Sequence, residues 1–503
     1  MEAATKRGGT IAWRTHPHLY EINAWIWLEH LSQRLERKVT LGTVPDTEWD
    51  ELQRLGFDLI WLMGVWERSP EARRIFQTDP AMFPQYDQAL PGWTWNQVVG
   101  SPYAVRNYSP DPHIGSWAEI DLVREKLHQR KMALILDFVP NHTALDHPWV
   151  CAHPEYYIRG SQEDFRRAPD AFYLAQTRDG DLTAIARAKD PYFPPWKDTA
   201  QLNYFSPTLR TALLKEIALI QTHCDGVRCD MAMLILNDIF LGNWSRLLKG
   251  DFPPAQEFWT EAFNAAPGGL WLGEVYWGLE RRLQEMGFQF TYDKSLYDML
   301  RDNRAQDVRS HLSADLSYLS RMGHFLENHD EARSAAVFGA ERLEAVGTLQ
   351  ATLPGLRFYH QGQLKGNRIH IPIALAAAAE EPVDPHTNAF YQRVLRLSNE
   401  PVYHAGEWKL LDAQPAGDAS SDNLIAYRWR LGKIAKLVVV NLSGATAQGR
   451  IQLGDEISAS ERYIFADELH DVEYPRDGKY VASQGLYVRL DPFGAQWFNI
   501  SPM

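Results

Sequence analysis

The sequence lacks long hydrophobic runs and any excess of basic residues. No stretch approaches the roughly 18 apolar residues needed to span a bilayer, so we expect no membrane helix. The formal net charge is −13. This acidic balance argues against nucleic acid or an anionic membrane as the main partner, because either would require a clustered basic face. A hydrophobic content of 45% then indicates a soluble folded protein.

Cysteine is scarce as well. Cys151, Cys224 and Cys229 are the only three, an odd number at spacings that match no zinc framework. Residues 1–10 are polar, and no apolar segment of the kind found in secretory signals follows them. We therefore expect reduced thiols in a cytoplasmic protein, with a mature secreted form cut from a longer precursor as the alternative.

The chain does contain a long alternation of amphipathic helices and short apolar strands. It has 503 residues, enough for two or three domains. Eight strand candidates lie at residues 19–22, 57–62, 132–139, 225–230, 270–275, 288–291, 321–326 and 356–359. Apolar strands alternating with helices predict a parallel sheet covered by helices, here a (β/α)8 barrel. An open doubly wound sheet is the alternative, but no glycine-rich phosphate loop supports it.

Helix ends are marked by residues of the expected types. Asp46 can cap a helix that Gly56 ends, and Ser116 with Glu119 fits a capping box. Pro207 stands at the first position of a further helix, where its missing N–H is not needed. These signals place the helices between the strand candidates.

Two regions depart from the alternation. Residues 143–205 are irregular and rich in proline, which predicts a loop-rich subdomain inserted after the third strand. Residues 400–503 contain short strands separated by turn residues, which predicts an all-β C-terminal sandwich. The barrel is then expected to comprise residues 1–142 and 206–399.

Acidic residues stand at the ends of three predicted strands. Asp230 follows the fourth strand, Glu274 the fifth and Asp330 the seventh. Active sites of such barrels lie at the carboxyl ends of the strands. Arg228 shares a sheet face with Asp230, and we expect its guanidinium to lower the pKa of that carboxyl. Three acids that converge on one barrel mouth predict acid–base chemistry rather than packing.

The contexts of these acids resemble those of the α-amylase superfamily, glycoside hydrolase family 13. The four blocks are Asp-Phe-Val-Pro-Asn-His at 137–142, Gly-Val-Arg-Cys-Asp at 226–230, Gly-Glu-Val at 273–275 and Glu-Asn-His-Asp at 327–330. The resemblance covers nearly the whole chain. It implies a retaining hydrolase that acts on α-glucosidic bonds of α-1,4-glucan or maltooligosaccharides through a covalent glycosyl-enzyme intermediate.

The resemblance also implies a role for each acid. Asp230 is then the nucleophile, Glu274 the general acid/base, and Asp330 the third carboxylate, which holds the distorted sugar. Trp271 and Trp277 flank Glu274 in the sequence, so we expect an apolar setting that keeps its proton available.

Further residues are implied to bind ligands. The substrate-binding set is Tyr103, His142, Arg228 and His329, with Tyr103 stacking beneath the sugar; the alternative for Tyr103 is a core residue. Asn141 resembles the family's calcium-binding asparagine, which implies a structural Ca²⁺, although no cofactor is required for the reaction. The alternative is an asparagine that caps a turn, because calcium requires six to eight oxygens.

The chain departs from the family pattern around the leaving-group side. Met231-Ala232-Met233-Leu234 stands where many members have Lys-His, and Gln201 stands where Asp is often found. These changes leave two enzymatic alternatives open, a transglycosylase and an enzyme for a small α-glucoside such as sucrose or trehalose. A third alternative is a non-catalytic barrel that binds carbohydrate or serves as a partner subunit.

Overall fold

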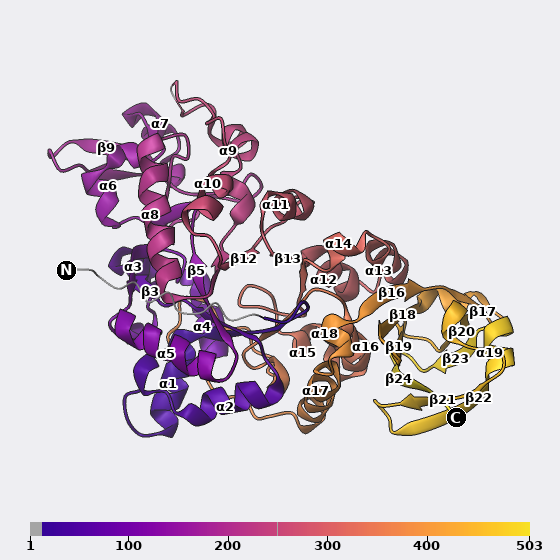
Figure 1. Cartoon of the computed structure of the whole chain (residues 1–503). Coiled ribbons are helices and arrows are strands. Elements are labelled where there is room, and N and C mark those ends of the chain that lie inside the picture. Colours follow the sequence, from indigo (N-terminus) through magenta and orange to yellow (C-terminus); the bar gives the residue numbers. More distant parts are fainter. Residues whose placement is uncertain (1–12, 249) are drawn as a thin grey trace, which may run out of the picture.

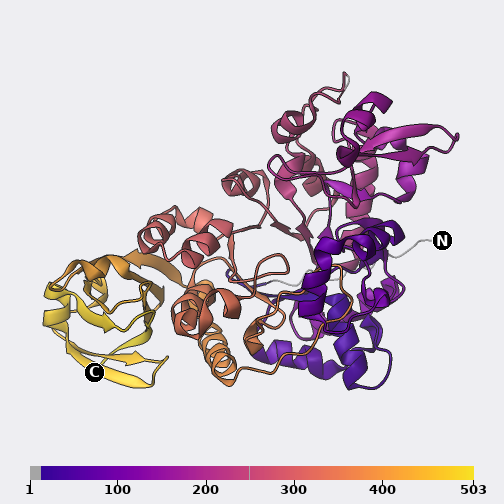
Figure 2. The ribbon, with the colours of Figure 1, turned by 180° about the vertical axis from the view of Figure 1, so that it is seen from behind.

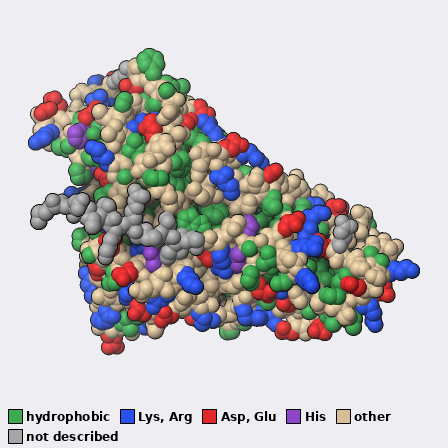
Figure 3. Space-filling model, in the orientation of Figure 1, with side chains coloured by type: hydrophobic (Ala, Val, Ile, Leu, Met, Phe, Trp, Pro, Cys, Tyr) green, Lys and Arg blue, Asp and Glu red, His purple; other side chains and the backbone are tan. Residues whose placement is uncertain are grey.

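The protein is elongated, with a barrel between an inserted subdomain and a C-terminal sheet domain (Figures 1 and 2). The structure, a computed structural model, describes residues 13–248 and 250–503. The polar residues 1–10, which carried the expectation of no signal segment, lie outside the described residues. Within the described ranges no helix has the length and apolar character to cross a membrane. On the face in Figure 3, Lys and Arg side chains are interspersed with Asp and Glu.

Eight parallel strands close into a barrel, as predicted. In order around the ring they are β1 (His18–Asn23), β2 (Leu59–Met63), β5 (Ala133–Phe138), β11 (Gly226–Cys229), β12 (Leu270–Gly273), β13 (Phe290–Tyr292), β14 (Met322–His324) and β15 (Leu356–His360). Because β1 pairs with both β2 and β15, the sheet has no edge. This closure rules out the open doubly wound sheet.

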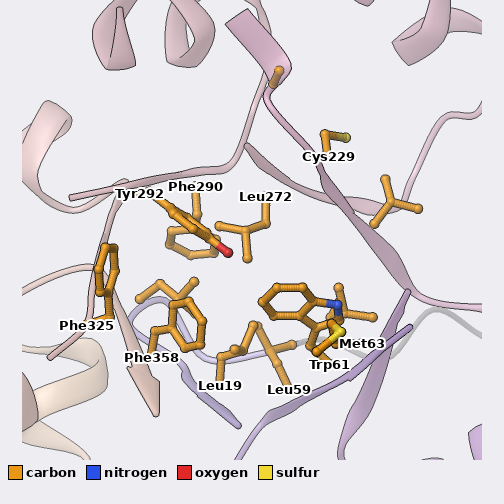
Figure 4. Packing of buried hydrophobic residues seen from close by; sticks show 14 of the residues in the cluster. Leu19, Leu59, Trp61, Met63, Cys229, Leu272, Phe290, Tyr292, Phe325 and Phe358 are labelled. Atoms are coloured by element: carbon orange, nitrogen blue, oxygen red, sulfur yellow. The ribbon is translucent and has the colours of Figure 1, made fainter. Parts of the chain in front are cut away.

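Large side chains fill the barrel interior (Figure 4). Leu19, Leu59 and Phe358 are fully buried there, and each such side chain contributes about 1.5–3 kcal/mol of stability. Trp61 and Tyr292 also point inward, and their polar atoms bond to residues at the strand ends. The packed interior therefore fixes the strand ends that carry the acids.

Helices surround the barrel (Figure 1). Those that follow barrel strands or flank the barrel include α1 (Ala24–Arg34), α2 (Asp46–Leu55), α5 (Trp117–Gln129), α8 (Pro207–His223), α9 (Asn237–Trp244), α10 (Phe258–Ala265), α12 (Lys294–Arg301), α13 (Ala305–Leu312), α16 (Gly339–Thr352) and α17 (Pro385–Ser398). Helix α8 begins at Pro207, as predicted, and the Ser206 side chain accepts from Leu209 N. Helix α2 ends before Gly56, whose φ of 82° is left-handed. Asp46 is the first residue of α2 rather than its cap.

The capping box predicted at the start of α5 is wrong. The Ser116 hydroxyl donates to Glu119 Oε2 at 3.0 Å and accepts no hydrogen bond from the helix backbone. The other Glu119 oxygen accepts from Thr40 and from the Gly42 amide. Glu119 thus ties the helix to a neighbouring loop, a contact that local spacing does not reveal.

The insertion after β5 carries two small sheets, β6–β10 and β7–β9–β8. Its elements are β6 (His142–Ala144), α6 (Pro148–Ala152), β7 (Arg159–Gly160), α7 (Gln162–Arg167), β8 (Phe172–Gln176), β9 (Leu182–Ala186) and β10 (Thr199–Gln201). A shorter excursion follows β2 and contains β3 (Trp66–Arg68), α3 (Pro70–Thr78), α4 (Phe83–Ala89) and β4 (Val105–Pro110). Both stand at the carboxyl ends of their strands, so they form walls around the barrel mouth.

The C-terminal region is all-β except for short helices, and it has its own hydrophobic core. A six-stranded antiparallel sheet packs against a three-stranded one. The strands are β16 (Glu407–Leu411), β17 (Ala413–Pro415), β18 (Leu424–Leu431), β19 (Ile434–Asn441), β20 (Ala447–Ile451), β21 (Arg462–Asp467), β22 (Val472–Asp477), β23 (Leu486–Leu490) and β24 (Ala495–Pro502). Asp477 caps the short helix α19 (Gly478–Gln484).

Candidate active site

The three predicted acids line one cavity of about 770 Å³ at the carboxyl ends of the barrel strands. Asp230 follows β11 and Glu274 follows β12, and the parallel register pairs Cys229 with Gly273. Adjacent strands in this register place the next residues side by side. Asp330 reaches the same cavity from the loop after β14. The structure thus brings together residues that are up to 100 positions apart.

Arg228 lies beneath the cavity and binds both neighbouring acids. Its Nη1 donates to Asp230 Oδ1 at 2.9 Å and its Nη2 to Glu274 Oε2 at 2.7 Å. Arg228 is fully buried, with the rings of Trp61 and Tyr103 at 5.1 and 5.2 Å from the guanidinium carbon. A buried guanidinium is stable only when it is paired, so the two carboxyl groups and Arg228 hold one another in place.

The pKa of Asp230 is not lowered, contrary to our expectation from the sequence. Burial and the nearby Glu274 raise it to about 8, and Arg228 opposes this rise without overcoming it. Two acids this close titrate as a pair, and the raised pKa means that the pair holds one proton through neutral pH. One charged and one protonated carboxyl is the state that a nucleophile and a proton donor require together.

Glu274 sits in a polar setting rather than the apolar one expected from its flanking tryptophans. The Tyr276 hydroxyl donates to Glu274 Oε1 at 2.6 Å, and the Met231 amide donates to Oε2 at 2.9 Å. The Trp271 ring packs away from the cavity, 4.8 Å from the ring of Phe263. Tyr276 was not predicted from the sequence, although its position two residues after Glu274 indicates that it can lie close to that acid.

Replacing Tyr276 by Phe should shift the basic limb of the pH–activity profile upward. The limb is expected near pH 8, where the Asp230–Glu274 pair loses its proton. The Tyr276 hydroxyl stabilises the ionised carboxylate, so its removal favours the protonated form and raises that pKa by up to about one unit. The profile of kcat/KM against pH measures this shift. Tyr474→Phe, on β22 of the C-terminal domain, is the control; an unmoved limb in Tyr276→Phe contradicts the assignment.

Asp330 is held ionised by a charged histidine. His329 Nε2 lies 3.0 Å from Asp330 Oδ2, and His329 Nδ1 lies 2.5 Å from Glu21 Oε1. Burial lowers the pKa of His329, but the two carboxylates outweigh it and raise that pKa well above its usual value. Partial desolvation raises the pKa of Asp330, yet His329 lowers it to about 2. Sequence reasoning missed Glu21, an acid at the end of β1.

Two further residues complete this side of the cavity. The Tyr103 hydroxyl lies 2.8 Å from His329 Nε2, and the two rings stack with centroids 5.2 Å apart. His142 also lines the cavity, with its ring centroid 5.2 Å from that of Trp196, and burial lowers its pKa to about 3. Tyr103 therefore lines the cavity, which distinguishes it from an ordinary core residue.

The loop that carries Asp330 is fixed by buried polar residues. Asn328 Oδ1 accepts from the amides of Asp330 and Glu331, both at 2.9 Å. Glu327 is fully buried and binds Arg333 Nη1 at 2.7 Å. Asp137, at the end of β5, accepts from Trp61 Nε1 and Gly64 N and does not line the cavity. Glu327 and Asp137, the remaining acids of the four blocks, thus hold neighbouring residues in place and do not line the cavity themselves.

Asn141, the residue predicted to bind calcium, is hydrogen-bonded to Gln201. Gln201 Nε2 donates to Asn141 O, Asn141 Oδ1 and Leu202 O at 3.0, 3.1 and 3.1 Å. An N–H₂ group therefore occupies the point where these three oxygens converge, and no carboxylate joins them. Across residues 13–248 and 250–503, no three His, Cys, Asp or Glu side chains gather as metal ligands. A divalent cation bound by neutral oxygens alone would lack the charge that calcium sites supply.

Comparisons with known proteins agree with this geometry. The family described as "Alpha amylase, catalytic domain" matches residues 47–373, more than half of the chain. Alpha-amylase 3 of Dictyoglomus thermophilum is 24% identical over 277 residues, covering 51% of this chain and 52% of that protein. The alpha-glucosidase of Apis mellifera is 22% identical over 369 residues, covering 65% and 63%. The chain thus spans less than two thirds of the length of these relatives.

Solved structures share the fold. The alpha-amylase of Geobacillus thermoleovorans, crystallised with acarbose, superposes with a TM-score of 0.65 at 18% identity and covers 97% of this chain and 99% of that one. A maltogenic alpha-amylase of Thermotoga neapolitana gives a TM-score of 0.64 at 18% identity, with 97% and 98% covered. At this identity the likeness concerns the architecture, including the barrel and the C-terminal sheets.

Proposed function

The chain belongs to the α-amylase family, and from this premise we propose that it is a retaining glycoside hydrolase of α-1,4-glucan or maltooligosaccharides. The observation that carries the proposal is the pair of acids bound to one buried arginine. Arg228 contacts Asp230 and Glu274 at 2.9 and 2.7 Å, and both acids open onto the cavity. Retaining glycosidases require two carboxyl groups close together, one charged and one protonated.

The proposed reaction has two steps. In the first, an Asp230 oxygen attacks the anomeric carbon while the bond from that carbon to the leaving oxygen breaks. Glu274 gives its proton to the leaving oxygen, and a glucosyl ester of inverted configuration forms on Asp230. In the second, Glu274 takes a proton from water, the water oxygen attacks the anomeric carbon, and the ester bond to Asp230 breaks. Two inversions restore the α configuration.

The neighbouring residues bind the sugar whose bond is cleaved. We assign the hydroxyl contacts to His142, His329 and Asp330, because these polar groups face the same part of the cavity. The negative charge of Asp330 also stabilises the positive charge that develops on the sugar in the transition state. Tyr103 lines the same part of the cavity and supplies an aromatic ring against which the sugar can pack.

A panel of α-glucans and α-glucosides tests the proposal, with the anomers of the first products followed by NMR. Maltoheptaose cleaved to shorter chains with α-anomeric ends is the expected result. Products longer than maltoheptaose favour the transglycosylase, and turnover of sucrose or trehalose alone favours the small-glucoside enzyme. No product from any substrate favours the non-catalytic barrel, and β-anomeric products contradict the retaining mechanism.

A cytoplasmic location remains part of the proposal. Cys151, Cys224 and Cys229 are all free thiols, and the last two are buried. Few, unpaired cysteines are typical of proteins from reducing compartments.

We further propose that this chain does not use calcium to hold its insertion to the barrel. Gln201 joins the start of the insertion to β10 through three hydrogen bonds to oxygens of Asn141 and Leu202. All three residues are buried. The amide nitrogen thus performs the cross-linking that a cation could perform at this position.

Chelation should leave the wild-type protein unchanged, whereas Gln201→Asp should make it respond to calcium. A carboxylate placed among three oxygens is repelled by them, so the variant should lose about 2–4 kcal/mol of stability. Added calcium should restore much of this loss in Gln201→Asp and none of it in the control Gln201→Ala. Melting temperatures with EDTA or calcium measure both effects. A wild-type melting temperature that falls in EDTA and recovers with calcium contradicts the proposal.

A further inference from the structure

Three aromatic side chains stand exposed at the mouth of the cavity. Tyr192 and Phe193, from the insertion, are 68% and 67% exposed, and Trp277, from the loop after β12, is 39% exposed. The rings of Tyr192 and Trp277 contact each other edge to face, with centroids 5.0 Å apart. Two segments 85 positions apart in the sequence thus meet through aromatic rings. Because these rings are largely exposed, packing in a hydrophobic core does not account for their contact.

The backbone at Trp277 has a conformation that is energetically unfavourable for a residue with a side chain. Its φ is 66°, in the left-handed region, and Gly278 follows with a φ of 73°. This conformation costs free energy for non-glycine residues, and residues that adopt it are found more often at functional sites. Met231 is also left-handed, with a φ of 41°, and its amide donates to Glu274. Both left-handed side chains line the cavity, on either side of Glu274 in the chain order.

The position of Trp277 identifies which part of a substrate it meets. Its neighbour Tyr276 donates to Glu274 Oε1 at 2.6 Å. Under the proposed mechanism Glu274 protonates the leaving oxygen, so the sugar beyond that oxygen must lie against the residues around Glu274. Those residues are Met231, Tyr276 and Trp277. Tyr103 and His329 lie around the other end of the bond, beside Asp330.

The segment that carries Tyr192 is held by hydrogen bonds to a buried carboxylate. Asp190 Oδ1 accepts from the amides of Tyr192 and Phe193 at 2.6 and 2.9 Å, and Asp190 is itself buried. Prolines at 191, 194 and 195 restrict the rest of this loop. Lys197 binds Asp79, which ties the loop to the excursion after β2. Tyr192 is therefore held in place to brace the Trp277 ring.

We infer that Trp277, with Met231, forms an apolar platform for the first sugar of the leaving group, and that Tyr192 braces it. This inference rests on the proposed function. The apolar face of a pyranose ring packs on an indole, so stacking replaces the polar side chains that the sequence lacks after Asp230. The preferred substrate is then a glucoside whose leaving group is itself a sugar.

Trp277→Ala should lower kcat/KM for maltotriose by about tenfold, because the loss of a stacking contact worth about 1.4 kcal/mol corresponds to a tenfold change. The same variant should keep the wild-type rate on α-glucosyl fluoride, which has no leaving-group sugar. Trp277→Phe should recover part of the loss, and Tyr192→Ala should show a smaller one. Trp95→Ala, which removes an exposed tryptophan outside the cavity, is the matched control and should change neither substrate.

Trp277→Gly separates binding from a structural role. Glycine accepts the left-handed backbone, so this variant should keep or raise the melting temperature while it loses maltotriose activity. The basic limb of the pH profile should stay where it is, because Glu274 and Tyr276 are untouched. Equal losses on maltotriose and α-glucosyl fluoride, or a lower melting temperature in Trp277→Gly, overturn the inference. Failure of the proposed function looks different, since the wild type itself would then not hydrolyse maltotriose to shorter products.

Discussion

Replacing Asp230 by Asn lowers kcat on maltooligosaccharides by roughly 10⁴-fold, the scale on which a catalytic unit loses activity when one member is removed. An amide oxygen cannot form the glucosyl ester, so the first step of the proposed reaction is lost. The change keeps the shape of the side chain, and Arg228 retains its 2.7 Å contact with Glu274. The melting temperature is therefore expected to change much less than the rate.

Azide distinguishes loss of the nucleophile from general damage. In Asp230→Ala, azide can enter the space that the carboxylate leaves and attack the anomeric carbon from the same side. An α-glucosyl fluoride then yields β-glucosyl azide, in which the azide nitrogen replaces fluoride with inversion. An Asp230→Asn protein that keeps more than about a tenth of the wild-type rate contradicts the assignment of the nucleophile.

Replacing Glu274 by Gln lowers kcat/KM on maltooligosaccharides by about 10²–10⁴-fold, the usual contribution of general acid catalysis. The variant cannot protonate the leaving oxygen. Fluoride departs without a proton, so formation of the ester from α-glucosyl fluoride should be affected much less. The ratio of the two rates in wild type and variant is the measurement.

The product formed with azide supplies the second test of Glu274. The ester on Asp230 still forms in Glu274→Gln, and azide attacks it without needing a general base, which yields α-glucosyl azide. Glu285→Gln, an exposed acid on α11 (Glu280–Met286), is the matched control and should behave as wild type. If both substrates lose rate equally in Glu274→Gln, Glu274 is not the proton donor.

The barrel could be predicted from the sequence because its signals are local. Each strand is a short apolar run, and each following helix has its own apolar stripe, so Leu19–Ile22 and Leu356–Tyr359 were recognisable although they are far apart. Parallel strands put their carboxyl ends on one side. That topology was sufficient to bring Asp230, Glu274 and Asp330 to a common cavity.

The electrostatics of the site required the structure. Arg228 near Asp230 suggested a lowered pKa, but burial and the second carboxyl raise it, and no sequence spacing shows how deeply a group is buried. Glu21 lies 308 residues from His329 and bonds to it only because β1 closes the barrel. The edge-to-face contact of Tyr192 with Trp277 likewise depends on how two distant loops meet.

The covalent intermediate offers the most direct test of the central claim. Incubation with 5-fluoro-α-glucosyl fluoride should form a glucosyl ester that hydrolyses slowly, because the second fluorine destabilises the positive charge of both transition states. Mass spectrometry of the digested protein should then find the fluoroglucosyl group on the peptide that contains Asp230, and not in Asp230→Asn. A label on another residue, or turnover of this reagent and of maltooligosaccharides to β-anomeric products with no labelled peptide, would contradict the account.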